Sequence, residues 1–159
     1  MAGISTAAEV TFTWANRRDF FDMSRIDDLV FECSWTADEF KKCAADQRTV
    51  IKTAAIRGIT VGYLIYSLEK HSVTITRIAS HPGYQRQGLG RVMLDRLFGG
   101  MASSRTHVYA AVPDDLLPAQ LFFRSMGFRC THIIRGESGD RDLYAFERSR
   151  RLSEMCQGR

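Results

Sequence analysis

The chain has 159 residues, of which 45% are hydrophobic and 25% are charged. This is the balance of an ordinary soluble globular protein, and the length suits one domain over residues 1–159 with loose termini at 1–9 and 150–159. No apolar run approaches the roughly 18–20 residues of a membrane helix, and the N-terminus lacks the features of a secretory signal. We therefore expect a cytoplasmic protein with no membrane partner.

The formal net charge is +4 and the pI is about 9.0. This excess fits an anionic partner, which could be nucleic acid, an acidic protein surface or a phosphorylated cofactor. The strands lack the interleaved aromatic residues of nucleic-acid-binding surfaces, so we expect no nucleic acid. The four cysteines have no CxxC spacing and no neighbouring histidine cluster, which predicts free thiols and no metal.

The first part of the chain predicts one strand and two helices. Thr11–Trp14 alternates weakly between polar and apolar residues and predicts a short strand. Apolar residues that include Phe21 and Leu29 predict a helix over Arg18–Glu32. The run Thr36-Ala-Asp-Glu39 has the form of a capping box, in which each side chain accepts a hydrogen bond from the other residue's backbone, and it predicts a second short helix.

The rest of the chain predicts six strands and two more helices. The predicted strands are Thr49–Arg57, Thr60–Glu69, Val73–Ser80, His107–Val112, Phe128–Arg135 and Asp142–Arg148. One helix begins near Leu89 and is expected to stop at Gly99-Gly100. The other has Pro118 in its first turn and ends at Gly127. This order predicts an α/β (α+β) fold, with a mixed, mainly antiparallel central sheet of about seven strands flanked by four helices.

The segment Ile78–Arg91 carries the clearest chemical signal, because a strand leads through a glycine-containing loop into a helix. Backbone N–H groups at a helix start are unpaired and the helix dipole adds positive charge, so such a start can bind an anion. Gly88 and Gly90 allow a pyrophosphate to approach the backbone, and Arg86 and Arg91 supply charge. Two glycines near a helix start occur about as often in a purely structural loop, and the spacing matches neither a Walker loop nor GxGxxG.

The motif Gln85-x-x-Gly88-x-Gly90 resembles the acetyl-CoA signature of the GNAT superfamily, Q/R-x-x-G-x-G/A. The run Tyr84–Arg91 is similar to the bacterial ribosomal-protein-alanine N-acetyltransferases, and so are Ser34–Thr36 and Ala119–Phe128. The resemblance covers about residues 10–148 and includes the order of elements. It implies a GNAT acyl-CoA N-acyltransferase fold, a single GNAT domain and acetyl-CoA as cosubstrate.

The resemblance also assigns the cofactor-binding residues. The backbone of the strand before the loop would bond to the pantetheine arm like an added strand, and the loop and helix start would hold the pyrophosphate. The implied cofactor-binding residues are Ile78, Ala79, Ser80, Gln85, Arg86, Gln87, Gly88, Leu89, Gly90 and Arg91.

The sequence departs from the family at the residues that handle protons. In the ribosomal-alanine enzymes a Glu acts as base and a Tyr as acid, and these positions correspond here to Ala111 and Phe123. An Asn that helps bind the cofactor corresponds to Leu116, and the late loop Gly136–Arg141 lacks the tyrosines that hold a peptide N-terminus. Loss of an acid or base typically lowers the rate about 10²–10⁴-fold. A low-pKa acceptor such as an α-amine would suit a weak base better than lysine.

The catalytic residues are therefore unknown from the sequence, with Tyr109 as the one candidate. It lies two residues before Ala111 and should share its face of the sheet as an acid or as a packed aromatic ring. His81 fits turn chemistry, and His107 has no partner pattern. Three functions stay open: N-acetylation of a protein or peptide N-terminus, N-acetylation of a small-molecule amine, and acyl-CoA binding with weak or no turnover.

Overall fold

The structure is a computed structural model, and it describes residues 9–150. The termini expected to be loose, 1–9 and 150–159, therefore lie almost entirely outside the described residues. Within 9–150, no helix is both long and apolar enough to cross a membrane.

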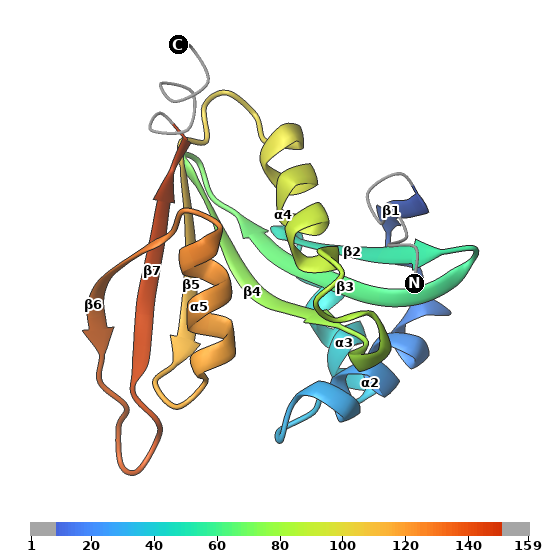
Figure 1. Ribbon diagram of the computed structural model, residues 1–159, viewed down its shortest axis with the longest axis horizontal. Helices are drawn as coiled ribbons and strands as arrows, with labels where there is room; N and C mark the ends of the chain where they lie inside the picture. The colour runs from blue at the N-terminus through green and yellow to red at the C-terminus, as the bar shows by residue number, and fades with distance from the viewer. Residues whose placement is uncertain (1–8, 151–159) are drawn as a thin grey trace. The chain divides into compact units, whose positions relative to one another are not determined.

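The predicted order of strands and helices is confirmed (Figure 1). The helices are α2 (Asp19–Val30), α3 (Ala37–Ala44), α4 (Leu89–Gly100) and α5 (Leu117–Ser125), with a 3-10 turn η1 (Pro82–Tyr84) before α4. The strands are β1 (Val10–Trp14), β2 (Thr49–Ile56), β3 (Ile59–Leu68), β4 (Ser72–Ser80), β5 (His107–Pro113), β6 (Arg129–Ile134) and β7 (Leu143–Ser149).

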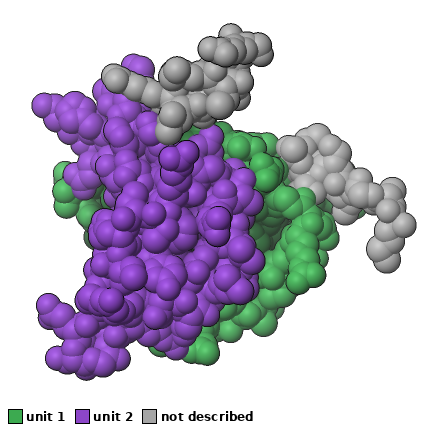
Figure 2. All heavy atoms as spheres, turned by 60° about the vertical axis from the view of Figure 1, so that its left-hand side comes forward, with its two compact units in different colours: residues 1–67, 77–101 green, residues 68–76, 102–159 purple. Residues whose placement is uncertain are grey.

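The seven strands form a mixed sheet in the order β1-β2-β3-β4-β5-β7-β6. β4 pairs with β5 in parallel, whereas β1–β2, β2–β3, β5–β7 and β6–β7 are antiparallel. The mainly antiparallel sheet and its four helices are as predicted. The chain divides into two compact units, residues 1–67 with 77–101 and residues 68–76 with 102–159, which are called unit 1 and unit 2 (Figure 2).

Unit 1 has helices on both faces of its strands (Figure 1). Side chains alternate along β3, so Tyr63 and Ile65 lie in one apolar cluster with residues of α2 and α3, including Phe40. The ring of Phe40 meets those of Trp35 and Tyr63 edge to face at 5.4 Å each. Gly62, the residue before Tyr63, faces the other side, where α4 begins.

The orientation of α2 differs from the apolar pattern of the sequence. Phe21 and Leu29 are 65% and 59% exposed, while Phe20, Met23 and Ile26 are buried. The buried stripe also contains a carboxylate, Asp27. Because a charged residue lies inside the buried stripe, hydrophobicity alone does not identify which face of the helix is buried.

The helix ends follow local chemistry. Thr36 and Glu39 form the predicted capping box of α3. At the end of α5, Gly127 takes a φ of +85°, and its N–H and that of Phe128 donate to the carbonyls of Arg124 and Phe123. This is the pattern of a Schellman motif. α4 ends at Gly100, so the expected stop at Gly99-Gly100 is confirmed, although both glycines are themselves helical at a cost of about 1 kcal/mol each relative to alanine.

Unit 2 has one covered and one open sheet face. α5 lies beside β5 and β7 in Figure 1, and the ring of its Phe123 meets those of Phe128 and Phe146 at 5.1 Å and 6.1 Å. Side chains alternate along β5, so Tyr109 points to the face of the sheet opposite to that of its neighbours Val108 and Ala110. β6 is the last strand of the sheet, and all six of its residues are exposed.

Candidate functional site

The end of β4 and the turn after it are held by backbone and imidazole hydrogen bonds. Ala79 is buried, and Ile78 and Ser80 are half-buried. The His81 N–H donates to the carbonyl of Val61 on β3 at 2.7 Å. The Nδ1 atom of His81 accepts a hydrogen bond from the Gly83 N–H at 3.0 Å, which confirms its role in turn chemistry.

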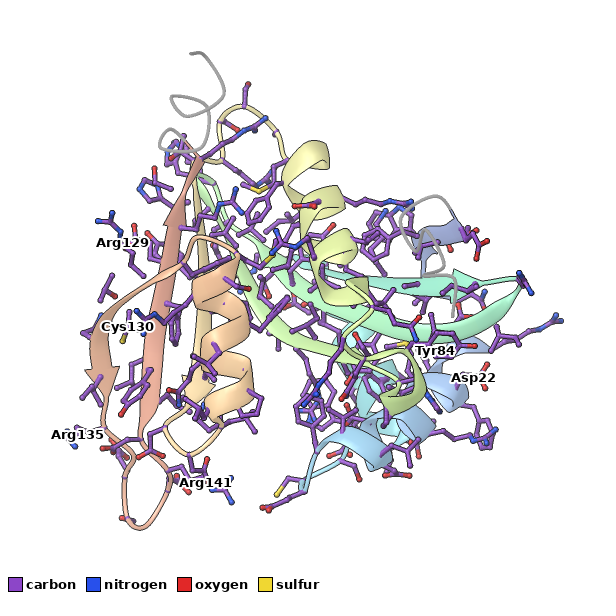
Figure 3. The ribbon with its side chains drawn as sticks, viewed as in Figure 1. Asp22, Tyr84, Arg129, Cys130, Arg135 and Arg141 are labelled. Carbon is purple, nitrogen blue, oxygen red and sulfur yellow. The ribbon has the colours of Figure 1, made fainter. Side chains whose placement is uncertain are left out.

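Two glutamine side chains connect the loop to the turn. Gln85 Nε2 donates to the carbonyl of Ser80 at 3.1 Å, and Gln87 Nε2 donates to the carbonyl of Gly83 at 3.4 Å. Tyr84 lies on the same turn (Figure 3). Gln85, the first residue of the signature, thus ties the loop back to the strand end.

The start of α4 has the geometry of an anion site. Gly88, the N-cap, has a φ of +81°, and Arg86 has a φ of 62°, so two backbone positions of this short loop are left-handed. The first α4 hydrogen bond runs from the Val92 N–H to the Gly88 carbonyl at 3.0 Å. The N–H groups of the helix residues before Val92 therefore precede the helical ladder, and Arg86 and Arg91 are exposed beside them. This arrangement fits a diphosphate.

Gly62 on β3 is a supporting residue that the sequence analysis missed. A Cβ atom there would lie 2.8 Å from the carbonyl oxygen of Ala79 and 3.2 Å from Cδ2 of Leu89. Only glycine therefore lets β3 approach both the end of β4 and the start of α4 this closely. The available signal was a glycine inside a strand pattern, which often marks a close backbone approach.

A buried charge cluster fixes the segment between α2 and α3. Arg77 on β4 donates from Nε and Nη2 to the two carboxylate oxygens of Asp27, at 2.8 Å and 2.7 Å. Tyr63 Oη and the Trp35 N–H also donate to this carboxylate, the latter at 2.6 Å. Burial, followed by the hydrogen bond to Asp27, raises the pKa of Tyr63 well above its usual range. The Arg77 guanidinium lies over the rings of Phe31 and Trp35, at 4.0 Å and 4.7 Å.

In unit 2, the two positions that the resemblance assigns to the base and the acid lie on opposite faces of the sheet. Ala111 is exposed on the open face of β5. Phe123 is 4% exposed and packs against two other phenylalanines on the covered face, so it belongs to the core. Leu116 is the N-cap of α5 and makes no side-chain cap. Tyr109 is 39% exposed and shares the open face with Ala111, as predicted.

The open face of unit 2 contains a pocket of about 420 Å³. Its lining residues are Thr74, Tyr109, Ala110, Ala111, Thr131, His132, Ile134, Ala145, Phe146 and Glu147. The pocket therefore brings together the candidate Tyr109 and the base position Ala111.

Next to the pocket lies a histidine–carboxylate contact that the sequence analysis missed. Glu147 on β7 is the register partner of Tyr109, and its Oε1 lies 3.5 Å from Nε2 of His107. The sequence shows no partner pattern for His107, and the structure gives it this carboxylate as a neighbour. Alternation along β7 puts Glu147 on the face of Ala145, but the pairing with β5 depends on a register that one sequence does not reveal. In the part of the chain that the structure describes, no group of three or more His, Cys, Asp or Glu could hold a metal ion.

The sequence model of the Acetyltransferase (GNAT) family matches residues 11–128. The fold is similar to that of the ribosomal-protein-S18-alanine N-acetyltransferase from Escherichia coli, with a TM-score of 0.77 and 21% identity over 88% of this chain and 93% of that chain. It is also similar to Naa50 from Arabidopsis thaliana in complex with the bisubstrate analogue CoA-Ac-MVNAL (TM-score 0.70, 22% identity, 89% and 99% covered). A third similar structure is the spermidine/spermine N-acetyltransferase SpeG from Vibrio cholerae (TM-score 0.74, 13% identity, 98% and 100% covered).

No curated protein matches the chain by sequence. At identities of 13–22% the likeness to these three structures concerns the fold alone. The family match is independent of it, spans most of the chain and contains the whole strand, turn and helix of the signature. The chain therefore belongs to the acetyltransferase (GNAT) family.

Proposed function

We propose that this protein transfers an acetyl group from acetyl-CoA to a primary amine by direct attack. The observation that carries the proposal is the start of α4, where two left-handed residues precede N–H groups that lie outside the helical ladder, and where Arg86 and Arg91 are exposed. The diphosphate of acetyl-CoA would accept from those N–H groups and pair with the arginines. The pantetheine arm would bond to the backbone of Ile78–Ser80.

The structural neighbours suggest the class of acceptor. The analogue bound to Naa50 joins CoA and an acetyl group to a peptide, and SpeG acts on spermidine and spermine. We propose a primary amine as the acceptor here, carried on a protein or peptide N-terminus or on a small molecule. We also propose that residues 1–159 act as one GNAT domain in the cytoplasm, since the family match includes residues of both units.

The reaction has a simple balance of bonds and protons. The amine nitrogen forms a bond to the carbonyl carbon of the thioester, and the carbon–sulfur bond breaks. The nitrogen loses one proton and the leaving thiolate gains one. Ala111 supplies no base, so an acceptor with a low pKa is favoured: an α-amine titrates near 8 and a lysine near 10.4. Tyr109 is the candidate proton donor to the thiolate.

A second function is favoured by the same departures. Ala111 and Phe123 replace both proton-handling groups of the resembled enzymes, and Phe123 is buried in the core. A protein that binds acyl-CoA but turns over weakly or not at all would need neither group. Such a protein would act as a sensor or a scaffold.

Two measurements separate these functions. Calorimetry with acetyl-CoA should show binding, and the double variant Arg86→Glu, Arg91→Glu should weaken it by roughly tenfold or more per arginine. The double variant Arg17→Glu, Arg18→Glu makes the same charge change at two exposed residues of the α2 entry and should bind normally. No heat from the wild type, or equal losses in both variants, would refute the cofactor site.

Release of free thiol is then followed with a panel of peptides and small amines. Release that depends on the amine supports the acetyltransferase. Tight binding of acetyl-CoA without release against every amine would favour the acyl-CoA-binding protein instead.

A further inference from the structure

The pocket on the open face of unit 2 is mostly apolar. Methyl groups and rings dominate its lining, with three alanines, Ile134 and Phe146 among its ten residues. Glu147 is the single carboxylate among those ten. A volume of about 420 Å³ lies within the range that small ligands occupy in proteins.

Glu147 is held by a neighbouring histidine. Its Oε1 lies 3.5 Å from Nε2 of His107, and Nδ1 of the same ring lies 2.8 Å from Oγ1 of Thr106. The tautomer with its proton on Nε2 satisfies both contacts, because the Thr106 hydroxyl can then donate to Nδ1. The His107 ring also stacks on Tyr109 at 6.2 Å. The carboxylate thus lies beside His107 while its side chain keeps 32% of its surface exposed.

A charged neighbour of Glu147 across the sheet is Arg129. It is the register partner of Glu147 on β6, and Figure 3 places its side chain at the outer edge of that strand. No ion pair joins Arg129 to Glu147 in the described part of the chain, and Arg129 does not line the pocket. The residues that line the pocket with Glu147 include His132, Tyr109 and two threonines besides the apolar groups, but no lysine or arginine.

The position of Glu147 relative to Ala111 bears on the missing base. Ala111 pairs with Ala145, and Tyr109 pairs with Glu147. Each cross-strand pair forms one row of the sheet, and these two rows are neighbours on one sheet face. Rows separated by two residues lie about 7 Å apart along a strand. A glutamate at 111 would occupy space that the two alanines leave open. The chain thus lacks a carboxylate at 111 but supplies one in the next row, from β7.

We infer that this pocket binds the acceptor of the proposed acetyl transfer, as an ammonium ion on an apolar body with Glu147 as its counter-ion. The bound ammonium releases one proton to solvent before its nitrogen attacks, because only the neutral amine has a free electron pair. The identification of the ligand as the acceptor rests on the proposed function, whereas the binding of an ammonium ion beside Glu147 does not. An ammonium buried without a partner is strongly unfavourable, and Glu147 is the carboxylate that can compensate it there. An N-terminal α-amine beside an apolar side chain and a free arylalkylamine share this chemistry.

Binding of 2-phenylethylamine to the full chain tests the inference, with 2-phenylethanol as its uncharged counterpart, each with and without coenzyme A. The wild type should bind the amine about tenfold more tightly than the alcohol. Glu147→Gln should lower the affinity for the amine about tenfold and leave that for the alcohol unchanged. Glu137→Gln, in the turn between β6 and β7, removes an equal charge outside the pocket and should change neither.

A second variant and a kinetic measurement complete the test. Ala145→Leu should fill the pocket and weaken both compounds, and a melting curve checks that each variant is folded. In turnover, Glu147→Gln should raise KM for the amine about tenfold with little change in kcat, since a counter-ion acts in binding. A peptide amide with N-terminal Phe distinguishes the two kinds of acceptor. If it binds more tightly than 2-phenylethylamine, the acceptor is a peptide N-terminus; if it binds more weakly, the acceptor is a small amine.

The inference is overturned if the wild type binds amine and alcohol equally, or if Glu147→Gln and Ala145→Leu both leave the amine affinity unchanged. These outcomes differ from failure of the proposed function, in which acetyl-CoA gives no heat and no thiol is released while the pocket still distinguishes amine from alcohol.

Discussion

Arg77 and Asp27, fifty positions apart in the chain, form a two-point ion pair in which Nε and Nη2 each donate to a different carboxylate oxygen. The Asp27 side chain is fully buried and that of Arg77 is 15% exposed. Nη2 also donates to the carbonyl of Cys33 at 3.1 Å. The pair therefore joins α2, β4 and the segment before α3.

Replacing Arg77 with Met should lower the free energy of unfolding by about 3–5 kcal/mol, because it leaves a buried carboxylate without its counter-ion. Arg77→Lys should recover little of this, since an ammonium cannot reproduce the two-point contact or lie flat between two rings. Urea unfolding of the variants measures the change. Arg25→Met, at an exposed position of α2, should stay within about 0.5 kcal/mol of the wild type. A loss of less than 1 kcal/mol for Arg77→Met would mean that the pair does not stabilise the fold.

Replacing Gly62 with Ala should affect both stability and the cofactor. The new Cβ would meet the Ala79 carbonyl at 2.8 Å, and backbone cannot move aside as a flexible side chain can. We expect a loss of about 1–3 kcal/mol in the free energy of unfolding. We also expect weaker binding of acetyl-CoA, because Ala79 and Leu89, which the new Cβ would displace, both belong to the proposed cofactor site. Gly99→Ala, where a Cβ meets no atom, is the control and should be neutral or slightly stabilising. Equal affinity for acetyl-CoA in wild type and Gly62→Ala would contradict the close approach.

Asp142 supplies a prediction about pH. The Gly136 N–H at 3.0 Å and then the Arg135 guanidinium at 2.5 Å donate to its carboxylate, and both lower the pKa of Asp142 below its ordinary 3.8. A lowered pKa means that the charged carboxylate stabilises the folded turn at pH values above the ordinary carboxyl pKa. This stabilisation is lost only as the pH falls through the folded pKa.

An NMR titration of the Asp142 carboxyl should therefore give a midpoint below 3.8. In Arg135→Gln the midpoint should rise yet stay below the ordinary value, because the larger cause, the Gly136 N–H, remains. Arg124→Gln, on α5, should leave the midpoint unchanged. A midpoint at or above 3.8 in the wild type would show that the turn does not hold Asp142 as described.

Tyr109→Phe tests the candidate acid. Loss of a proton donor should lower kcat about 10²–10⁴-fold with little change in KM for acetyl-CoA, whereas a ring that only packs would tolerate the loss of its hydroxyl. Thiol release under saturating acetyl-CoA measures the effect. Tyr144→Phe, on β7 but outside the pocket lining, is the matched control. Unchanged kcat in Tyr109→Phe would remove Tyr109 from the chemistry and leave it as a wall of the pocket.

Much of the fold was predictable because its signals are local. The capping box of α3 and the glycine end of α5 each lie within six residues, and so does the signature from Gln85 to Gly90. The rest depends on contacts distant in sequence. The rotation of α2 follows from Asp27 meeting Arg77, and the His107–Glu147 pair follows from the β5–β7 register. Neither can be inferred from spacing along one chain.

The exposed strand β6 has a consequence for the behaviour of the protein at high concentration. Its outer edge offers unpaired backbone groups, and Ile133 and Ile134 are 46% and 43% exposed beside them. Such an edge can recruit a strand from another molecule and seed aggregates. Arg129 begins this strand and, as a like charge on every copy, opposes such pairing by repulsion, whereas the charge of Arg135 is paired with Asp142. We therefore expect Arg129, which takes no part in the proposed chemistry, to favour the solubility of this protein.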